Sequence, residues 1–226
     1  MIHNYKIDIS SKPQEELQLV RTVGSYNYWR IYFDTFEHEE ERHTETVTHK
    51  EEVTKTITVK DENGNDVKQE VIEVVEREEE VEVSVYESKY VEVRKFNKEA
   101  VNALDLMKEL IIEEITAYDT SSDVNSFYLD NKRVWLDKDT RVGLMNSTTI
   151  QKTAGYTTTT LWLGTTPITL ECDLAIQMLG ALEIYALDCF NKTAEHKKNV
   201  STLETVSEVA NYDYTEGYPE KLTFNL

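Results

Sequence analysis

The sequence predicts an α+β protein with an N-terminal antiparallel β unit that carries a long projecting β-hairpin, a connecting helix, and a small mixed α+β domain. Three observations predict this class. Apolar and polar residues alternate through 44–93, apolar residues recur at helical spacing through 97–117, and short strand and helix patterns alternate after residue 117. We therefore expect units at 1–96, 97–117 and 118–226.

The segment 44–93 reverses at Asn63-Gly64-Asn65, where residues that tolerate positive φ concentrate. A three-residue loop there puts Thr54, Thr56 and Thr58 on one face and three apolar cross-strand pairs on the other. A two-residue Asn63-Gly64 turn would scramble these faces, because it pairs Ile57 with Glu70. The β-branched content favours strands over the alternative, a charged helix across 67–93. The apolar pairs are Ile57 with Val71, Val53 with Val75, and Val47 with Val81.

This hairpin predicts an arm. Its first strand from 46 to 60 reaches about 50 Å when extended. Two-stranded ribbons are marginal in water and their edges are open to pairing, so a partner must cover the ribbon or charges such as Glu76 to Glu82 must guard it. We expect the arm to lie on a neighbouring subunit, with a solvated hairpin as the alternative. The predicted protein-interaction residues are Val47, Val53, Ile57, Val71, Val75, Val81, Trp135 and Trp162.

Charge and hydropathy exclude several classes. The 226-residue chain has a net charge of −19, which argues against direct nucleic-acid binding. No apolar stretch has the length of a membrane span, and residues 1–12 lack the features of a signal peptide, so we expect a protein made in a cytoplasm. Cys172 and Cys189 flank a helix at about 26 Å, beyond disulfide reach, and are expected to be free thiols.

The remaining elements follow from local signals. Strands are expected at 1–9 and 25–36, and Asn97 is the expected N-cap of the helix to residue 117. After it we expect hairpins at 124–129 with 133–136 and at 158–163 with 168–170, a helix capped by Asp137 through 144, and short helices at 194–200 and 203–210. The best-defined core helix carries Leu174, Met178, Leu182, Tyr185 and Cys189, with Ala175, Leu179, Ala186 and Phe190 beside them.

The second half of the chain carries spaced tryptophans and a tyrosine-rich tail. The relevant segments are Tyr118 to Phe127, Val134-Trp135-Leu136-Asp137 with Thr140-Arg141, Leu161-Trp162, Gln177-Met178-Leu179, Leu182 to Ala186, and Tyr212 to Pro219. These segments resemble the family called domain of unknown function 4376, over about half the chain. The resemblance implies a virion protein of a tailed bacteriophage, commonly tail-associated or fibre-like. It transfers no catalytic residue, and the N-terminal half lies outside it.

Each chemical site has a plainer interpretation. His38 and His43 lie five residues apart, which puts them on opposite faces of a strand, so a solvated charge run is favoured over a metal site. The aspartates Asp119, Asp123, Asp130, Asp137 and Asp139 suit turns and caps as well as calcium or glycosidase chemistry. Trp135, Trp162, Tyr212, Tyr214 and Tyr218 suit core and rim as well as a sugar-stacking surface. His196 is expected at the surface. No catalytic, cofactor-binding or metal-binding residue is predicted, and no cofactor.

Three function classes compete. The first is a structural virion protein, most simply tail-associated as a fibre, adaptor or ring component, with a head-decorating or head-fibre protein as the alternative. It is expected to be a homo-oligomer that contacts other virion proteins and is not an enzyme. The second is a glycan-binding or glycan-cleaving protein, which predicts carboxylates and tryptophans in one cleft. The third is an acidic mimic of DNA, which the alternation of acidic residues with valines makes less favourable.

Overall fold

A computed structural model describes residues 2, 4–60, 62 and 66–226 of the chain. It contains two compact units: unit 1 comprises Met1–Asn4, Leu17–Ile31 and Glu92–Leu226, and unit 2 comprises Tyr5–Glu16 and Tyr32–Val91. Antiparallel strands dominate the first part of the chain, and helices with small sheets follow, so the predicted α+β class is confirmed. The predicted division into 1–96, 97–117 and 118–226 stays a prediction.

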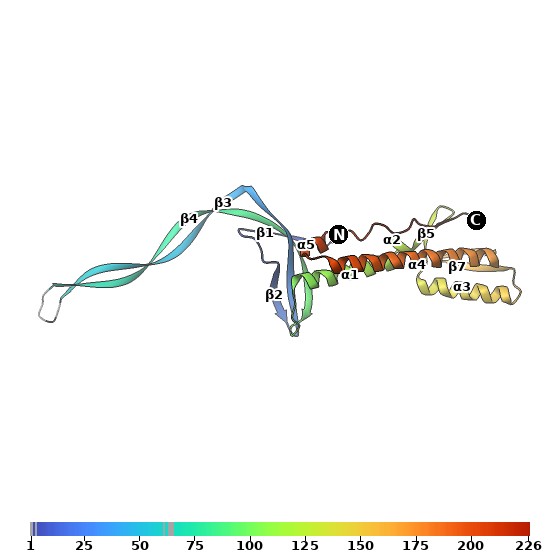
Figure 1. Ribbon diagram of the computed structural model, residues 1–226, viewed down its shortest axis with the longest axis horizontal. Helices are drawn as coiled ribbons and strands as arrows, with labels where there is room; N and C mark the ends of the chain where they lie inside the picture. Colours follow the sequence, from blue (N-terminus) through green and yellow to red (C-terminus); the bar gives the residue numbers. More distant parts are fainter. Residues whose placement is uncertain (1, 3, 61, 63–65) are drawn as a thin grey trace. The chain divides into compact units, whose positions relative to one another are not determined.

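Unit 2 contains most of two long strands, whose remaining residues belong to unit 1. Strand β3 (Tyr26–Lys60) has 35 residues and β4 (Asp66–Phe96) has 31, and the two are hydrogen-bonded neighbours. Strand β1 (Lys6–Ser10) pairs antiparallel with β4, from Lys6 opposite Tyr90 to Ser10 opposite Tyr86. Figure 1 shows β3 and β4 twisting about each other. The helical alternative for 67–93 is therefore wrong. The reversal at Asn63-Gly64-Asn65 lies outside the described residues.

Ion pairs across the ribbon reveal which residues share a face. Between residues 49 and 79, each ion pair joins two odd-numbered or two even-numbered residues, which the two-residue turn would put on opposite faces. The predicted faces are therefore confirmed, with the apolar pairs on the odd-numbered face and Thr54, Thr56 and Thr58 on the other. The four pairs are His49–Glu79 at 3.7 Å, Lys50–Glu76 at 3.1 Å, Glu51–Arg77 at 3.3 Å and Lys55–Glu73 at 3.1 Å.

A small aromatic core stabilises the inner end of unit 2. The side chains of Tyr32, Phe33 and Tyr90 are buried, and the rings of Tyr32 and Tyr90 lie 5.4 Å apart. The Tyr32 hydroxyl donates to Asp8 of β1 at 3.1 Å. Asp34 has a positive φ of 48°, and its carboxylate accepts a hydrogen bond from Lys89 at 3.0 Å. These contacts hold β1, β3 and β4 together where the aromatic residues of 25–36 cluster.

Unit 1 contains all the helices of the described chain. Strand β2 (Leu17–Val23) forms a hairpin with the first residues of β3. Both predicted hairpins further along are confirmed, except that Val124 and Asn125 are helical, and the tight turn of the first has positive φ at Asp130 and Asn131. The short parallel pairing of β9 with β5 is not predicted by the sequence. The elements are α1 (Ala103–Thr120), α2 (Ser122–Asn125), β5 (Ser126–Leu129), β6 (Lys132–Trp135), α3 (Lys138–Thr153), β7 (Thr158–Leu163), β8 (Thr166–Glu171), α4 (Cys172–Thr202), α5 (Val206–Ala210) and β9 (Thr223–Phe224).

Several helix ends differ from the predictions. Asn102, not Asn97, caps α1, because its side chain accepts from the backbone N–H of Asp105 at 2.8 Å. Asp137 caps α3 as predicted, but the helix continues to Thr153. The separate helix expected at 194–200 is the end of α4, since no glycine or proline interrupts 181–202.

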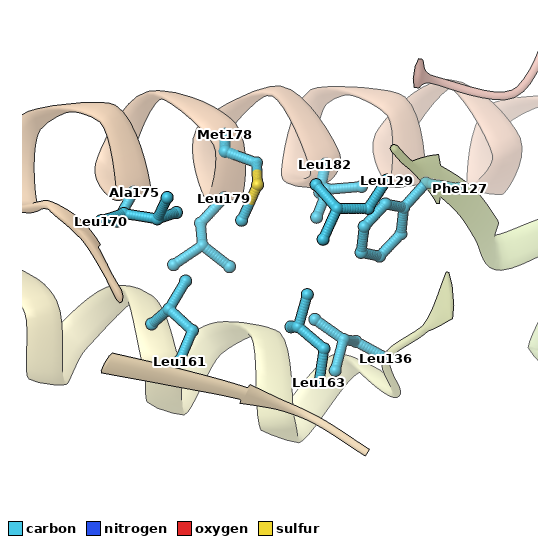
Figure 2. Close-up of a cluster of buried hydrophobic side chains, with 10 residues drawn as sticks. All are labelled: Phe127, Leu129, Leu136, Leu161, Leu163, Leu170, Ala175, Met178, Leu179 and Leu182. Carbon is cyan, nitrogen blue, oxygen red and sulfur yellow. The ribbon is translucent and has the colours of Figure 1, made fainter. Parts of the chain in front are cut away.

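The core of unit 1 lies where α4 packs against α3 and the small sheets (Figure 2). Met178, Leu182, Tyr185 and Cys189 are buried as predicted, whereas Leu174 is 45% exposed and Phe190 60% exposed. Cys172 and Cys189 are buried free thiols, as expected. Across the described part of the chain, no helix has the length and apolar character needed to cross a membrane. Core residues that point toward one another in Figure 2 are Phe127, Leu129, Leu136, Leu161, Leu163, Leu170, Ala175, Met178, Leu179 and Leu182.

Candidate functional site

A cleft of about 590 Å³ opens in unit 1 between the start of α3 and the middle of α4. The end of α1, helix α2 and the segment that follows β6 complete its walls. Glu183, Ala186, Leu187 and Phe190 line it from α4, because residues three, four and seven apart share one face of a helix. The other lining residues are Asp119, Thr120, Asn125, Trp135, Leu136, Asp137, Lys138, Asp139 and Arg141.

Arg141 is the fixed polar group of this cleft. Only 6% of the residue is exposed. Its Nη1 donates to the carbonyl oxygen of Leu136 at 2.9 Å and its Nε donates to the Glu183 carboxylate at 3.0 Å. Since Leu136 also belongs to the hydrophobic core, the guanidinium links the cleft to the core of unit 1.

The four carboxylates of the cleft differ in their surroundings. Asp137 accepts from the N–H and the hydroxyl of Thr140 at 2.9 and 2.7 Å, and these bonds, the hydroxyl first, lower the pKa of its carboxyl below the ordinary value. Asp119 accepts from the Thr193 hydroxyl at 2.8 Å. Glu183 is held by Arg141, and Asp139 lies exposed in the first turn of α3. The cleft therefore offers several carboxylate oxygens as hydrogen-bond acceptors.

The structure separates the two tryptophans that the sequence singles out. Trp135 is 46% exposed and lines the cleft. Trp162 is 59% exposed on the outer face of the β7–β8 hairpin, opposite Pro167, and does not line it. Sequence reasoning missed Leu187 and Phe190 as cleft residues, because helical spacing alone assigned Phe190 to the core.

The apolar residues of the ribbon are half covered by their neighbours across the strands. Val47, Val53 and Val75 are half-buried, whereas Ile57, Val71 and Val81 are exposed. Two residues that the prediction missed are more exposed than any of these six. They are Ile72 at 65% and Val74 at 58%, on the even-numbered face with the threonines. Whether any of these residues contacts another protein stays a prediction.

His196 is buried rather than at the surface, which corrects the prediction. Only 4% of it is exposed, because the tyrosine-rich tail folds back over α4. The Glu216 carbonyl oxygen can only accept, so Nε2 of His196 carries the proton at 3.0 Å from it, and Nδ1 accepts from the Tyr212 hydroxyl at 2.8 Å. The Tyr218 ring stacks on the imidazole at 5.6 Å. Tyr214 is also buried and donates to Glu114 at 3.1 Å.

This burial predicts a pH dependence of stability. Desolvation lowers the pKa of His196 below its ordinary value. The hydrogen bond to the Glu216 carbonyl and the nearby carboxylates of Glu195 and Asp213 oppose this shift but do not cancel it. In the unfolded chain His196 takes up a proton near pH 6.5, whereas in the folded chain it does so only at a lower pH. The free energy of unfolding should therefore fall as the pH drops below about 6.5, by up to about 1.4 kcal/mol per pH unit. Urea unfolding between about pH 7.5 and 5 measures it. His196→Gln should flatten this slope, and an unchanged slope in the variant would refute the assignment.

The two histidines that were weighed as metal ligands can be only partly placed. His38 lies 3.5 Å from Glu87 across the ribbon, and the side chain of His43 lies outside the described residues. Among the residues that the structure describes, no three His, Cys, Asp or Glu side chains come together as metal ligands would.

Comparison of the chain with protein families, with curated proteins and with solved structures finds no match. The resemblance to domain of unknown function 4376 therefore rests on the sequence segments quoted above and stays a prediction.

Proposed function

We propose that the chain is a structural protein of a tailed-bacteriophage virion, tail-associated as a fibre, adaptor or ring component, and that the ribbon of β3 and β4 contacts a second copy of the chain. A head-decorating or head-fibre protein is the alternative position in the particle. Other virion proteins are its further partners, and its role is assembly rather than catalysis. The observation that carries the proposal is the length of a ribbon that has two strands and open edges.

The open edges follow from the strand pairing. Strand β2 lies beside β3 only over Tyr26–Ile31, and β1 lies beside β4 only over Tyr86–Tyr90. Over 36–60 of β3 and 66–85 of β4, no other described strand lies alongside, so one row of backbone N–H and C=O groups on each strand faces outward. Two-stranded ribbons of this kind are marginal in water, and open edges are templates for strand addition. Pairing with a second copy would offset the entropy lost on ordering the ribbon.

Exposed apolar side chains are more numerous toward the tip of the ribbon, whereas glutamates are more numerous in the inner part of β4. The exposed apolar residues Ile57, Val59, Val71, Ile72 and Val74 lie toward its tip. Glutamates at 76, 78, 79, 80 and 82 occupy the part nearer the base, and all of them are exposed. Because burying unpaired carboxylates is costly, the contact with a second copy is expected at the outer part, while the glutamates stay in water.

A deletion tests this proposal. Removing residues 45–82 and closing the gap with a short turn should leave unit 1 folded, since its core and helices lie outside the deleted segment. The full chain should form a defined oligomer by native mass measurement, and the deletion variant should be monomeric. A monomeric full chain, or an oligomer of unchanged mass after the deletion, would refute the proposed role of the ribbon.

Point variants provide the matched control. Ile72→Glu with Val74→Glu should dissociate the oligomer, because it puts two charges on the outer part of the contact. Glu78→Gln with Glu80→Gln changes the same strand in its acidic part and should leave the oligomer intact. Equal effects of the two pairs would place the contact elsewhere on the ribbon.

A further inference from the structure

We propose that the cleft beside Trp135 and Phe190 in unit 1 binds an uncharged glycan, through stacking of a sugar ring on these side chains and hydrogen bonds to the surrounding carboxylates and Arg141. This inference concerns a site in unit 1 and is independent of the proposed role of the ribbon.

The cleft exposes large apolar side chains inside a concave site. Trp135 is 46% exposed, Leu187 58% and Phe190 60%, although all three line the cleft. Large apolar side chains are usually covered in a folded domain, and their combination in one cleft is typical of ligand sites. The volume of about 590 Å³ lies within the range of such sites. Aromatic faces suit the apolar face of a pyranose ring.

The polar groups of the cleft include both donors and acceptors, and several of them are held in fixed orientations. A sugar hydroxyl donates one hydrogen bond and accepts others, so it fits a site that holds both carboxylates and N–H donors. A guanidinium has five N–H groups, and the bonds from Arg141 to Leu136 and Glu183 hold it in a fixed orientation while using two of them. Asp137 is fixed by Thr140 and Asp119 by Thr193, so these acceptors are ordered before a ligand arrives.

The charges that line the cleft disfavour an anionic ligand. Four carboxylates line the cleft (Asp119, Asp137, Asp139, Glu183) against two cations (Lys138, Arg141). Arg141 is already paired with Glu183, so an anionic ligand would meet carboxylates without a free buried cation. Phosphates, nucleotides and acidic polysaccharides are therefore disfavoured. A neutral sugar avoids this repulsion and uses the carboxylates as acceptors.

The geometry favours binding over cleavage. Glycoside hydrolysis needs a carboxylic acid that is protonated at the working pH, which requires a raised pKa. Asp137 has the opposite tendency, because the Thr140 bonds stabilise its ionised form. The Asp137 carboxylate is thus suited to hold a hydroxyl group rather than to protonate a glycosidic oxygen.

Titration calorimetry of the full chain with maltotetraose, cellotetraose and chitotetraose tests this inference. We expect at least one of these neutral tetrasaccharides to bind with a Kd below about 1 mM, and tetragalacturonate, which is acidic, to bind at least about tenfold more weakly. If no neutral tetrasaccharide binds at about 10 mM, or if tetragalacturonate binds best, the inference is wrong.

Variants assign the binding to the cleft. Trp135→Ala should weaken binding by about tenfold or more, and Phe190→Ala should weaken it as well. Trp162→Ala is the matched control, because Trp162 is also exposed but lies outside the cleft, and it should leave the Kd unchanged. Both Trp135 and Phe190 are largely exposed, so circular dichroism and thermal unfolding should show that the variants remain folded. Binding that survives the double variant of Trp135 and Phe190 would refute the site.

Discussion

Leu179→Ala should lower the free energy of unfolding of unit 1 by about 2–5 kcal/mol, the loss typical of a buried leucine replaced by alanine. Leu179 is 0% exposed and belongs to the core cluster. Figure 2 shows it pointing from α4 toward Leu161 of β7. The substitution removes apolar surface from the core and leaves a cavity, because the helix and the hairpin on either side are tied into other contacts. Urea unfolding followed by circular dichroism measures the loss.

Leu187→Ala on the same helix is the control for this prediction. Leu187 is 58% exposed, so the same substitution removes little buried surface, and the change should stay within about 0.5 kcal/mol. The prediction fails if both variants lose the same stability. Leu187 also lines the cleft, so weaker glycan binding by this variant, which stays folded, would reflect a lost contact in the cleft and not unfolding.

The ribbon is the part of the fold that the sequence predicts best. Its side chains alternate with a period of two, and a wrong register would exchange the apolar and charged faces. The ion pairs Lys55–Glu73 and Glu51–Arg77 agree with the predicted faces because the same alternation places opposite charges across the strands. Local chemistry also predicted the Asp137 cap of α3, since a cap depends only on residues a few positions away.

Contacts between distant segments account for the main errors. His196 is polar and lies among lysines, so its own neighbours suggest exposure, yet residues 212–218 cover it. On α4, apolar residues surround the helix, and helical spacing alone could not decide that Met178 faces the core while Phe190 faces the cleft. The short strand β9 also depends on a distant partner, β5, and two residues carry too little pattern to predict it.

The cleft illustrates the same limit. Its aspartates and Trp135 were recognised as candidates, but their assembly with Glu183 and Phe190 requires the tertiary packing of α1, α3 and α4. The condition set by the sequence for a glycan-related function, carboxylates and a tryptophan in one cleft, is met for Trp135 but not for Trp162.

Arg141→Met should lower the free energy of unfolding by about 2 kcal/mol or more, because it removes one partner from two buried or half-buried hydrogen bonds. The Leu136 carbonyl would lose its side-chain donor, and the Glu183 carboxylate its cation. Since Glu183 is 35% exposed, it can still turn toward water, and the loss should be smaller than for a fully buried ion pair. Urea unfolding measures it, and the same variant should weaken glycan binding.

Lys152→Met supplies the comparison on the same helix. Lys152 pairs with Asp173, but 51% and 65% of their side chains are exposed, so the loss should stay below about 1 kcal/mol. Adding Glu183→Met to Arg141→Met should restore part of the lost stability, because the unpaired carboxylate is then gone and the two side chains can pack together. If Lys152→Met costs as much as Arg141→Met, or if the second substitution adds to the loss, then Arg141 does not act as the buried anchor between the core and the cleft.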